Sequence, residues 1–286
     1  MVNRLAQKWR GIVEAWRDYP LQPGKLWNGR YRIERLLGMG SYGQAYLCID
    51  LETNEQVLLK RNKPSKGQTG IELLRRESEI MSALDHPQIP KRLAYSRRRR
   101  DEALIMQYVN GHNLEYMIYE QNETYSEAEA LKMLQLLLKP IRYLHEQGYV
   151  HRDVRIPNVL LQGGLLHLVD FGLACRIGER LPEHLLEALG EGSGLAKDSA
   201  AAVKRRMRTP APASDWFGLG HLFLFVMYAG YEPAAGAEEK SWEAELELQP
   251  EVKHFVGKLL NDEYAWVTTE QCERELAALL DRLNER

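Results

Sequence analysis

Cysteine is scarce in this chain, with three residues among 286. Cys48, Cys175 and Cys272 lie far apart and form no CxxC pair. An odd number of widely spaced thiols argues against a disulfide framework and against a zinc site. Such a pattern is typical of proteins in a reducing compartment, so we expect a cytoplasmic protein.

Long apolar runs and an excess of one charge are also missing. The longest apolar run, Leu222 to Ala229, has eight residues, whereas a membrane-spanning helix needs about 20. Charged side chains between Arg4 and Asp18 interrupt any signal-peptide core. Because 38 lysines and arginines face 40 aspartates and glutamates, no basic field favours nucleic acid, and we expect no such partner.

The remaining composition is that of a globular protein, with 44% hydrophobic and 27% charged residues, and 286 residues allow two domain-sized units. Residues 1–30 form the first predicted segment. Leu5, Trp9 and Trp16 recur at helical spacing before Pro20 and Gly24, which predicts an amphipathic helix and a linker. We favour docking of this helix on its own protein; a membrane surface or an unknown partner is the alternative.

Residues 31–109 combine strands with one helix. From Tyr31 to Lys60 the residues are β-prone and broken by glycines, which predicts an antiparallel sheet. Gly70 to Leu84 carries apolar residues at helical spacing, and Arg92 to Tyr108 predicts a further hairpin with arginines 97–100 at its tip. We interpret these arginines as a solvated loop, with a phosphate-bearing partner as the alternative.

Residues 110–286 are predicted to be mostly helical. Ser126 and Glu129 form a capping-box signature before an apolar stripe, in which Pro140 predicts a kink. Trp216 to Tyr228 predicts a second, strongly apolar helix. The chain is therefore expected to be α+β, with a β-rich first part and a larger helical second part.

A glycine-rich motif, GMGSYG, lies between two predicted strands from Gly38 to Gly43. Because a dinucleotide-binding fold requires this motif between a strand and a helix, that fold is excluded. Glycines let backbone N–H groups approach phosphate oxygens closely, although a flexible hairpin explains the motif equally well. Lys60 ends the next strand, where its ammonium group can neutralise phosphate charge or simply be solvated.

Two further motifs bring oxygen ligands together. HRDVRIPNVLL supplies Asp153 and Asn158 in a tight loop, and VDFGL supplies Asp170 after an apolar strand. Carboxylate and amide oxygens suit Mg²⁺, and a carboxylate can orient a hydroxyl nucleophile. Together with Lys60, these residues describe a site for a magnesium nucleotide.

The order and near spacing of these motifs resemble the protein-kinase superfamily between Tyr31 and Leu280. The chain looks most like compact bacterial serine/threonine kinases of the Hanks type. The resemblance implies a bilobal fold with a small β-rich lobe, residues 31–109, and a larger helical lobe, residues 110–286. It also implies ATP and Mg²⁺ as ligands and an unidentified protein as substrate.

The resemblance also implies catalytic roles for particular residues. Lys60 corresponds to the lysine that holds the α- and β-phosphates, and Glu77 to its helix partner, with Glu79 as the alternative. Asp153 corresponds to the catalytic aspartate. Arg155 replaces a lysine and can still reach a γ-phosphate, although it presents a planar guanidinium group instead of the point charge of an ammonium group.

Binding residues follow from the same resemblance. Asn158 and Asp170 correspond to the Mg²⁺ ligands. His151, Phe171 and Asp215 are expected to have structural roles, with Asp215 fastening the catalytic loop. The expected nucleotide contacts are Gly38, Gly40, Ser41, Gly43, Ala45, Leu58, Lys60, Met106, Gln107, Val109 and Leu160.

Several positions depart from the family pattern. Ala45 replaces a valine and Leu58 an alanine, a roughly volume-conserving exchange that predicts retained nucleotide binding. No APE triplet precedes Asp215. The arginine that pairs with the glutamate of this triplet in the family is missing too, so neither charge of the pair is left buried without its partner. Arg152 corresponds to an arginine that in many relatives receives a phosphate. The hydroxyls available for that modification are Ser193, Ser199, Thr209 and Ser214.

These observations predict an active, divergent serine/threonine protein kinase. A small-molecule kinase on the same fold is the first alternative, because the missing APE triplet leaves peptide docking open. A non-catalytic scaffold that binds nucleotide is the second. Polar residues of the types that catalysis in the family requires are present at Lys60, Asp153, Asn158 and Asp170, which argues against the scaffold.

Overall fold

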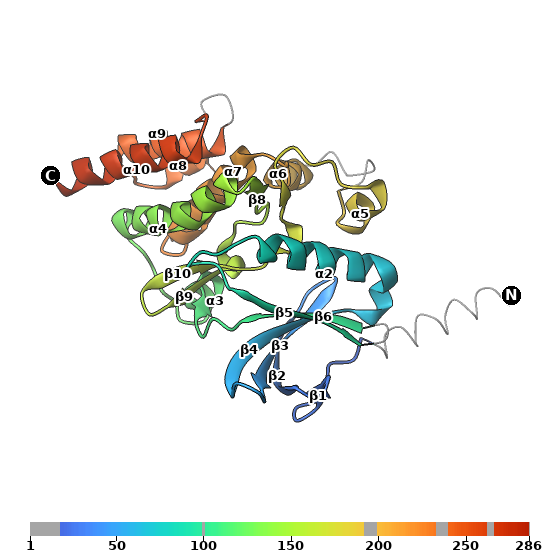
Figure 1. Ribbon diagram of the computed structural model, residues 1–286. Coiled ribbons are helices and arrows are strands. Elements are labelled where there is room, and N and C mark those ends of the chain that lie inside the picture. Colours follow the sequence, from blue (N-terminus) through green and yellow to red (C-terminus); the bar gives the residue numbers. More distant parts are fainter. Residues whose placement is uncertain (1–17, 99–100, 192–198, 233–239, 262–265, 286) are drawn as a thin grey trace, which may run out of the picture. The chain divides into compact units, whose positions relative to one another are not determined.

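The computed structural model describes residues 18–98, 101–191, 199–232, 240–261 and 266–285 (Figure 1). Most of the expected N-terminal helix, two of the arginines at the hairpin tip and the candidate phosphosite Ser193 lie outside these residues. The chain divides into two compact units. The first comprises Met1–Ala83, Pro90–Tyr108 and Leu181–Ser193, and the second comprises Leu84–Ile89, Val109–Arg180 and Gly194–Arg286.

The first unit is built on an antiparallel sheet, in which the strand order is β1-β2-β3-β4-β6-β5. The strands are β1 (Leu26–Trp27), β2 (Tyr31–Met39), β3 (Gly43–Asp50), β4 (Glu55–Asn62), β5 (Arg92–Arg98) and β6 (Asp101–Gln107). The sheet predicted from the β-prone sequence and the hairpin after it are thus confirmed. Helix α2 (Gly67–Ser82) packs against β4, β5 and β6 and begins earlier than its apolar spacing predicted, at Gly67.

The two faces of this sheet differ in character. Side chains alternate between the faces along each strand. One face carries a buried core cluster that includes Ile33, Tyr46, Cys48, Leu59 and Ile105. The residues that directly precede and follow them in the sequence therefore belong to the opposite face. This face includes Lys60, which was predicted to contact phosphate.

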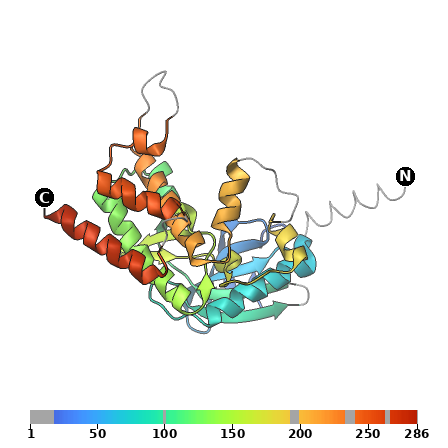
Figure 2. The same cartoon turned by 90° about the horizontal axis from the view of Figure 1, so that it is seen from above.

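The second unit is mainly helical, as the sequence predicted (Figures 1 and 2). Helix α4 packs against α7 and α10, and α7 also packs against α9. The helices are α3 (Leu114–Tyr119), α4 (Glu127–Glu146), α6 (Ser199–Met207), α7 (Pro212–Tyr228), α8 (Trp242–Glu245), α9 (Pro250–Leu260) and α10 (Thr269–Asn284). Within the ranges that the structure describes, none of the helices combines the length and the apolar character that a bilayer crossing requires.

Helix α4 begins where the capping signature predicted. The Ser126 side chain accepts a hydrogen bond from the backbone of Glu129, and the Glu129 carboxylate accepts one from the backbone of Ser126. These reciprocal bonds satisfy backbone donors of the first turn. The helix then continues through Pro140 to Glu146, with its apolar stripe buried.

Short strands in the second unit hold the loops that carry the chemistry. Strands β7 (His112–Asn113), β9 (Val159–Gln162) and β10 (Leu165–Leu168) form one antiparallel sheet. Strands β8 (Tyr149–Val150) and β11 (Cys175–Arg176) pair with each other. The HRD loop therefore begins directly after β8, and the VDFGL motif follows β10.

Candidate active site

In the first unit, Lys60 and Glu77 form an ion pair. Lys60 Nζ lies 2.7 Å from Glu77 Oε1, and the side chains are 20% and 3% exposed, respectively. Lys60 lies in β4 and Glu77 on α2, so the packing of the helix against the sheet brings them together. The alternative partner, Glu79, is exposed. The expected pairing of Lys60 with Glu77 is therefore the one found.

Three of the apolar residues expected around adenine, Ala45, Leu58 and Met106, share the face of the sheet that carries Lys60. Ala45 lies opposite Lys60 in the β3–β4 register, and Leu58 lies opposite Met106 in the β4–β6 register. The small Ala45 and the larger Leu58 thus lie on the same face of neighbouring strands, two positions apart along β4, where a loss of volume can offset a gain. This arrangement agrees with the compensation that the sequence predicted.

The glycine-rich motif forms the hairpin between β2 and β3. A hydrogen bond of 2.9 Å from Gly40 N to Gly43 O closes the turn around Ser41. A Cβ atom at Gly43 would lie 3.2 Å from the carbonyl oxygen of Arg61 and 3.6 Å from Lys60 Cε. The bare glycine therefore allows the hairpin and the lysine side chain to lie close together.

In the second unit, Asp153 lies between Arg155 and Asn158. Arg155 Nε is 3.0 Å from Asp153 Oδ1, and Asn158 Nδ2 donates to Asp153 Oδ2 at 2.7 Å and to the Asp153 carbonyl oxygen at 2.9 Å. The carboxylate is thereby held at both oxygens. Within the described part of the chain, both hydrogen bonds of the Asn158 side chain use Nδ2, so its Oδ1 is the atom left to bind a cation.

Asp170 ends the segment that follows β10. The backbone N–H of Val169 donates to the carbonyl oxygen of Asn158 at 3.0 Å, which ties the two oxygen-bearing segments together. Asp170 is exposed and has a φ of 64°, a left-handed conformation that aspartate tolerates better than most residues. Its Oδ1 accepts a bond of 3.3 Å from Gly172 N. The carboxylate is thus presented to solvent at a fixed turn.

The donor set fits Mg²⁺. This ion prefers oxygen ligands and keeps several of its sites for water and phosphate, so one or two protein carboxylates suffice. Asp170 supplies a carboxylate and Asn158 an amide oxygen. Among the residues that the structure describes, no group of three or more histidine, cysteine, aspartate or glutamate side chains forms an all-protein cage.

The residues with expected structural roles are buried around the catalytic loop. The rings of His151 and Phe171 pack edge to face at 4.9 Å. Asp215, at the start of α7, accepts hydrogen bonds from the backbone N–H groups of His151 and Arg152, each at 2.8 Å. The expected fastening of the loop by Asp215 is therefore present.

Arg152 binds backbone carbonyl groups. Its guanidinium donates to the carbonyl oxygen of Arg208 at 2.6 Å and to that of Leu173 at 3.1 Å. These bonds join the catalytic loop to the last residue of the basic KRRMR run and to the last residue of the VDFGL motif. The candidate phosphosite Ser214 is buried, and its hydroxyl donates to the Ala211 carbonyl oxygen at 2.8 Å.

Gly218 on α7 allows that helix to approach the catalytic loop. A Cβ atom at Gly218 would lie 2.8 Å from the carbonyl oxygen of Val154 and 2.9 Å from its Cβ, directly after Asp153. We expect Gly218→Ala to lower the free energy of unfolding by about 1–3 kcal/mol, because the added methyl group overpacks this contact. Thermal and chemical unfolding of the purified variant measure the effect.

Gly257→Ala on α9 is the matched control for Gly218→Ala. A Cβ atom at Gly257 meets nothing within 4 Å. We expect Gly257→Ala to raise the free energy of unfolding by about 0.5–1 kcal/mol, because alanine has less conformational freedom than glycine in the unfolded chain. Equal stability of the two variants would contradict the close approach of α7 to the loop.

Sequence reasoning missed a contact of the segment that follows the VDFGL motif. Helix α5 (Glu183–Ala188) packs against α2, and Leu185 lies in an apolar cluster with Leu73. The hydroxyl of Tyr42, in the glycine-rich motif, donates to the carbonyl oxygen of Ala188. His184 Nε2 also lies 3.0 Å from Glu72 Oε2. No local pattern marks these residues, because every contact joins positions far apart in the sequence.

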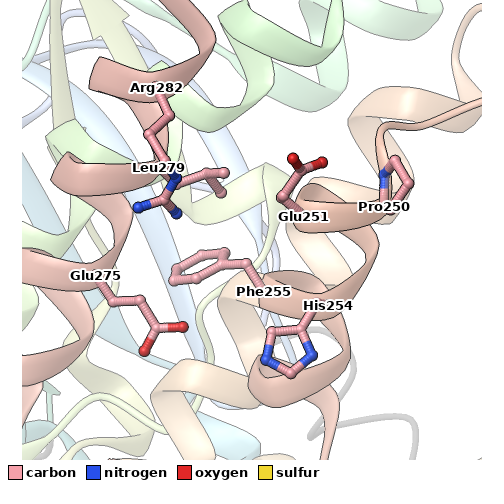
Figure 3. A pocket seen from close by; sticks show the side chains of 7 residues that line it. All are labelled: Pro250, Glu251, His254, Phe255, Glu275, Leu279 and Arg282. Atoms are coloured by element: carbon pink, nitrogen blue, oxygen red, sulfur yellow. The ribbon is translucent and has the colours of Figure 1, made fainter.

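A surface pocket of about 290 Å³ lies between α9 and α10 (Figure 3). Phe255 of α9 and Leu279 of α10 face each other in it, and charged side chains such as Glu251 and Arg282 surround them. None of the residues predicted to bind nucleotide or metal lines this pocket. It is therefore separate from the candidate active site.

Comparison with known proteins connects this geometry to a family. The model of the family described as "Protein kinase domain" matches residues 31–286. The chain is 32% identical over 263 residues to the probable serine/threonine-protein kinase YbdM of Bacillus subtilis, and this match covers 91% of the chain and 93% of YbdM. It is 29% identical over 218 residues to the serine/threonine-protein kinase PrkC of the same bacterium, covering 74% of the chain and 32% of PrkC.

Solved structures share the fold at lower sequence identity. The kinase domain of PknI from Mycobacterium tuberculosis matches with a TM-score of 0.66 and 19% identity, over 92% of the chain and 98% of that domain. The apo form of PpkA-294 matches with a TM-score of 0.68 and 19% identity, over 91% of the chain and 99% of its own length. These likenesses support the fold expected from the sequence.

Proposed function

The chain belongs to the protein kinase family, and we propose how its own residues transfer the γ-phosphoryl group of ATP to a protein hydroxyl. As a member of this family, the protein is an ATP-dependent serine/threonine protein kinase. The observation that carries the proposed site is the pairing of its polar side chains: Lys60 with Glu77, and Asp153 with Arg155 and Asn158.

Residues of the first unit contact the phosphates of the nucleotide in this proposal. The Lys60 ammonium group contacts the α- and β-phosphates, and the buried Glu77 carboxylate fixes its position. Backbone N–H groups of Gly38, Gly40, Ser41 and Gly43 approach the phosphates. The adenine contacts are apolar side chains and backbone groups, namely Ala45, Leu58, Met106, Gln107, Val109 and Leu160.

Asp153 orients the substrate hydroxyl and accepts its proton. Its two carboxylate oxygens are held by Arg155 and Asn158, so little reorganisation is needed when the hydroxyl arrives. We assign Arg155 to positioning Asp153, and the expected reach toward the γ-phosphate is the alternative role.

Asn158 Oδ1 and the Asp170 carboxylate would hold Mg²⁺. When bound, the ion neutralises negative charge on the phosphates and orients them. Asn158 has a double function, because its Nδ2 holds Asp153 while its Oδ1 remains for the cation. The metal ligand Asn158 and the base Asp153 are thereby held in a fixed geometry relative to each other.

We further propose a protein substrate in the cytoplasm. All three cysteines are free thiols and are buried, which agrees with folding in a reducing compartment. The basic run Lys204 to Arg208 lies in and after α6, but its arginines already have partners and do not define a substrate class.

The test is a direct assay of transfer. The purified protein is incubated with Mg²⁺ and γ-labelled ATP, alone and with a generic protein substrate, and the products are mapped by mass spectrometry. We expect label on serine or threonine. ATP consumption without phosphoprotein would indicate a small-molecule kinase, and ATP binding without turnover would indicate a scaffold; either result would contradict the proposal.

A further inference from the structure

A buried chain of hydrogen bonds leads away from the catalytic loop to helix α10. Asp215 has no exposed surface and accepts the backbone N–H groups of His151 and Arg152, which directly precede Asp153. Burial alone would raise the pKa of Asp215, but the hydrogen bonds from His145 and from the loop lower it overall. The loop is therefore attached to an ionised carboxylate, and whatever holds that carboxylate also holds the loop.

Two side chains continue the chain beyond Asp215. His145, in the last turn of α4, has its Nε2 atom 2.8 Å from Asp215 Oδ2. Its other ring nitrogen, Nδ1, lies 2.6 Å from the hydroxyl oxygen of Thr269. Trp216 Nε1 lies 3.0 Å from the same hydroxyl oxygen. Residues from α4, α7 and α10 thus meet in one network.

The donors and acceptors at the two ends of this network favour one arrangement of its protons. The indole N–H of Trp216 can only donate, so Thr269 Oγ1 accepts there and must direct its own hydrogen elsewhere. In the favoured arrangement the hydroxyl donates to His145 Nδ1, 2.6 Å away, and the ring proton lies on Nε2. At the other end a carboxylate can only accept, and the Nε2–H group of His145 donates to Asp215.

The Thr269 hydroxyl is not used for helix capping. The N-cap of α10 is Thr268, whose side chain accepts from Gln271 N, whereas Thr269 is the first helical residue and is 4% exposed. The two adjacent threonines therefore have separate tasks. One closes the helix end, and the other faces the buried network.

We propose that Thr269 is a positioning residue for phosphoryl transfer: its hydroxyl selects the Nε2–H tautomer of His145, which holds Asp215 and through it the catalytic loop. The inference rests on the proposed function, because the loop matters only if Asp153 acts on a substrate hydroxyl. Without the hydroxyl, Trp216 Nε1 and His145 Nδ1 both lose a buried partner, and the His145 ring keeps only its contact with Asp215.

The experiment compares three variants of the full chain. Thr269→Val keeps the shape of the side chain and removes the hydroxyl, Thr269→Ser keeps the hydroxyl, and Thr268→Val removes the neighbouring helix cap. We expect Thr269→Val to lower kcat by about tenfold or more with an unchanged KM for ATP, since small misplacements of a catalytic group have large effects. Thr269→Ser should stay within about twofold of the wild type.

Thr268→Val separates positioning from stability. It should lower the melting temperature, because a helix cap is lost, and leave kcat unchanged. If Thr269→Val keeps the wild-type kcat, or if Thr268→Val lowers kcat as much as Thr269→Val does, the inference is overturned. An inactive wild-type protein would instead contradict the proposed function, which the inference requires.

The tautomer gives a readout that does not depend on activity. Nitrogen-15 NMR of the histidine rings, with His145 assigned from a His145→Asn variant, distinguishes a protonated Nε2 from a protonated Nδ1. We expect protonation at Nε2 alone in the wild type and in Thr269→Ser, and a changed Nδ1 signal in Thr269→Val. A wild-type His145 protonated at Nδ1 would overturn the inference even in an active enzyme.

Discussion

Replacing Asp170 by asparagine is expected to abolish Mg²⁺-dependent turnover. The substitution keeps the size of the side chain and removes the exposed charged carboxylate that we assign to the cation. Loss of a metal ligand of this kind costs several kcal/mol in the transition state, which corresponds to a decrease of at least about 10³-fold in kcat. Incorporation of γ-labelled phosphate into protein over a series of Mg²⁺ concentrations measures the effect.

The control for Asp170→Asn is Asp85→Asn. Asp85 is also exposed, and among the described residues only its backbone N–H, not its carboxylate, forms a hydrogen bond, donating to the Tyr143 hydroxyl. This variant should retain wild-type turnover, and both variants should unfold at the wild-type temperature. Turnover of Asp170→Asn within tenfold of the wild type, at saturating Mg²⁺, would show that another residue holds the ion.

The second large effect is expected for Asp153→Asn. Asparagine cannot accept the hydroxyl proton, so we expect kcat to fall by at least about 10²-fold. The KM for ATP should change little, because Asp153 is assigned to the substrate hydroxyl and not to the nucleotide. Steady-state kinetics with a protein substrate separate the two quantities.

Arg155→Ala distinguishes the base from its support. Arg155 is half exposed and bonds to Asp153 Oδ1. Its removal should lower kcat less than Asp153→Asn does, and adding Arg155→Ala to Asp153→Asn should have little further effect, since residues that act as a unit are not additive. A large additional loss in the double variant would assign Arg155 a role apart from Asp153.

The sequence alone identified the parts of this site that depend on local pattern. The β-prone residues broken by glycines indicated the strands, and the strand register places Ala45, Leu58 and Lys60 on one face. The capping box at Ser126 gave the start of α4, since both bonds lie within one turn. The choice of Glu77 over Glu79 came from the family resemblance, and the structure supports it because one of these side chains is buried and the other exposed.

Contacts between distant parts of the chain were not predictable in this way. Thr269 and His145 are 124 positions apart, and neither position has a local pattern that pairs it with the other. Tyr42 and Ala188 are separated by 146 positions. Such contacts are decided by how helices pack, and a single sequence with ordinary apolar stripes does not specify which polar residues then meet.

The three buried cysteines supply a reporter of unfolding in each unit. Cys48 lies in the sheet core of the first unit, and burial raises its pKa to about 12; Cys175 and Cys272 are buried in the second unit, where burial also raises the pKa of Cys272. A thiolate is the reactive form, so a folded molecule should resist alkylation even in an excess of reagent. Labelling then proceeds only through opening, and mass spectrometry of the three sites gives the opening rate of each unit separately.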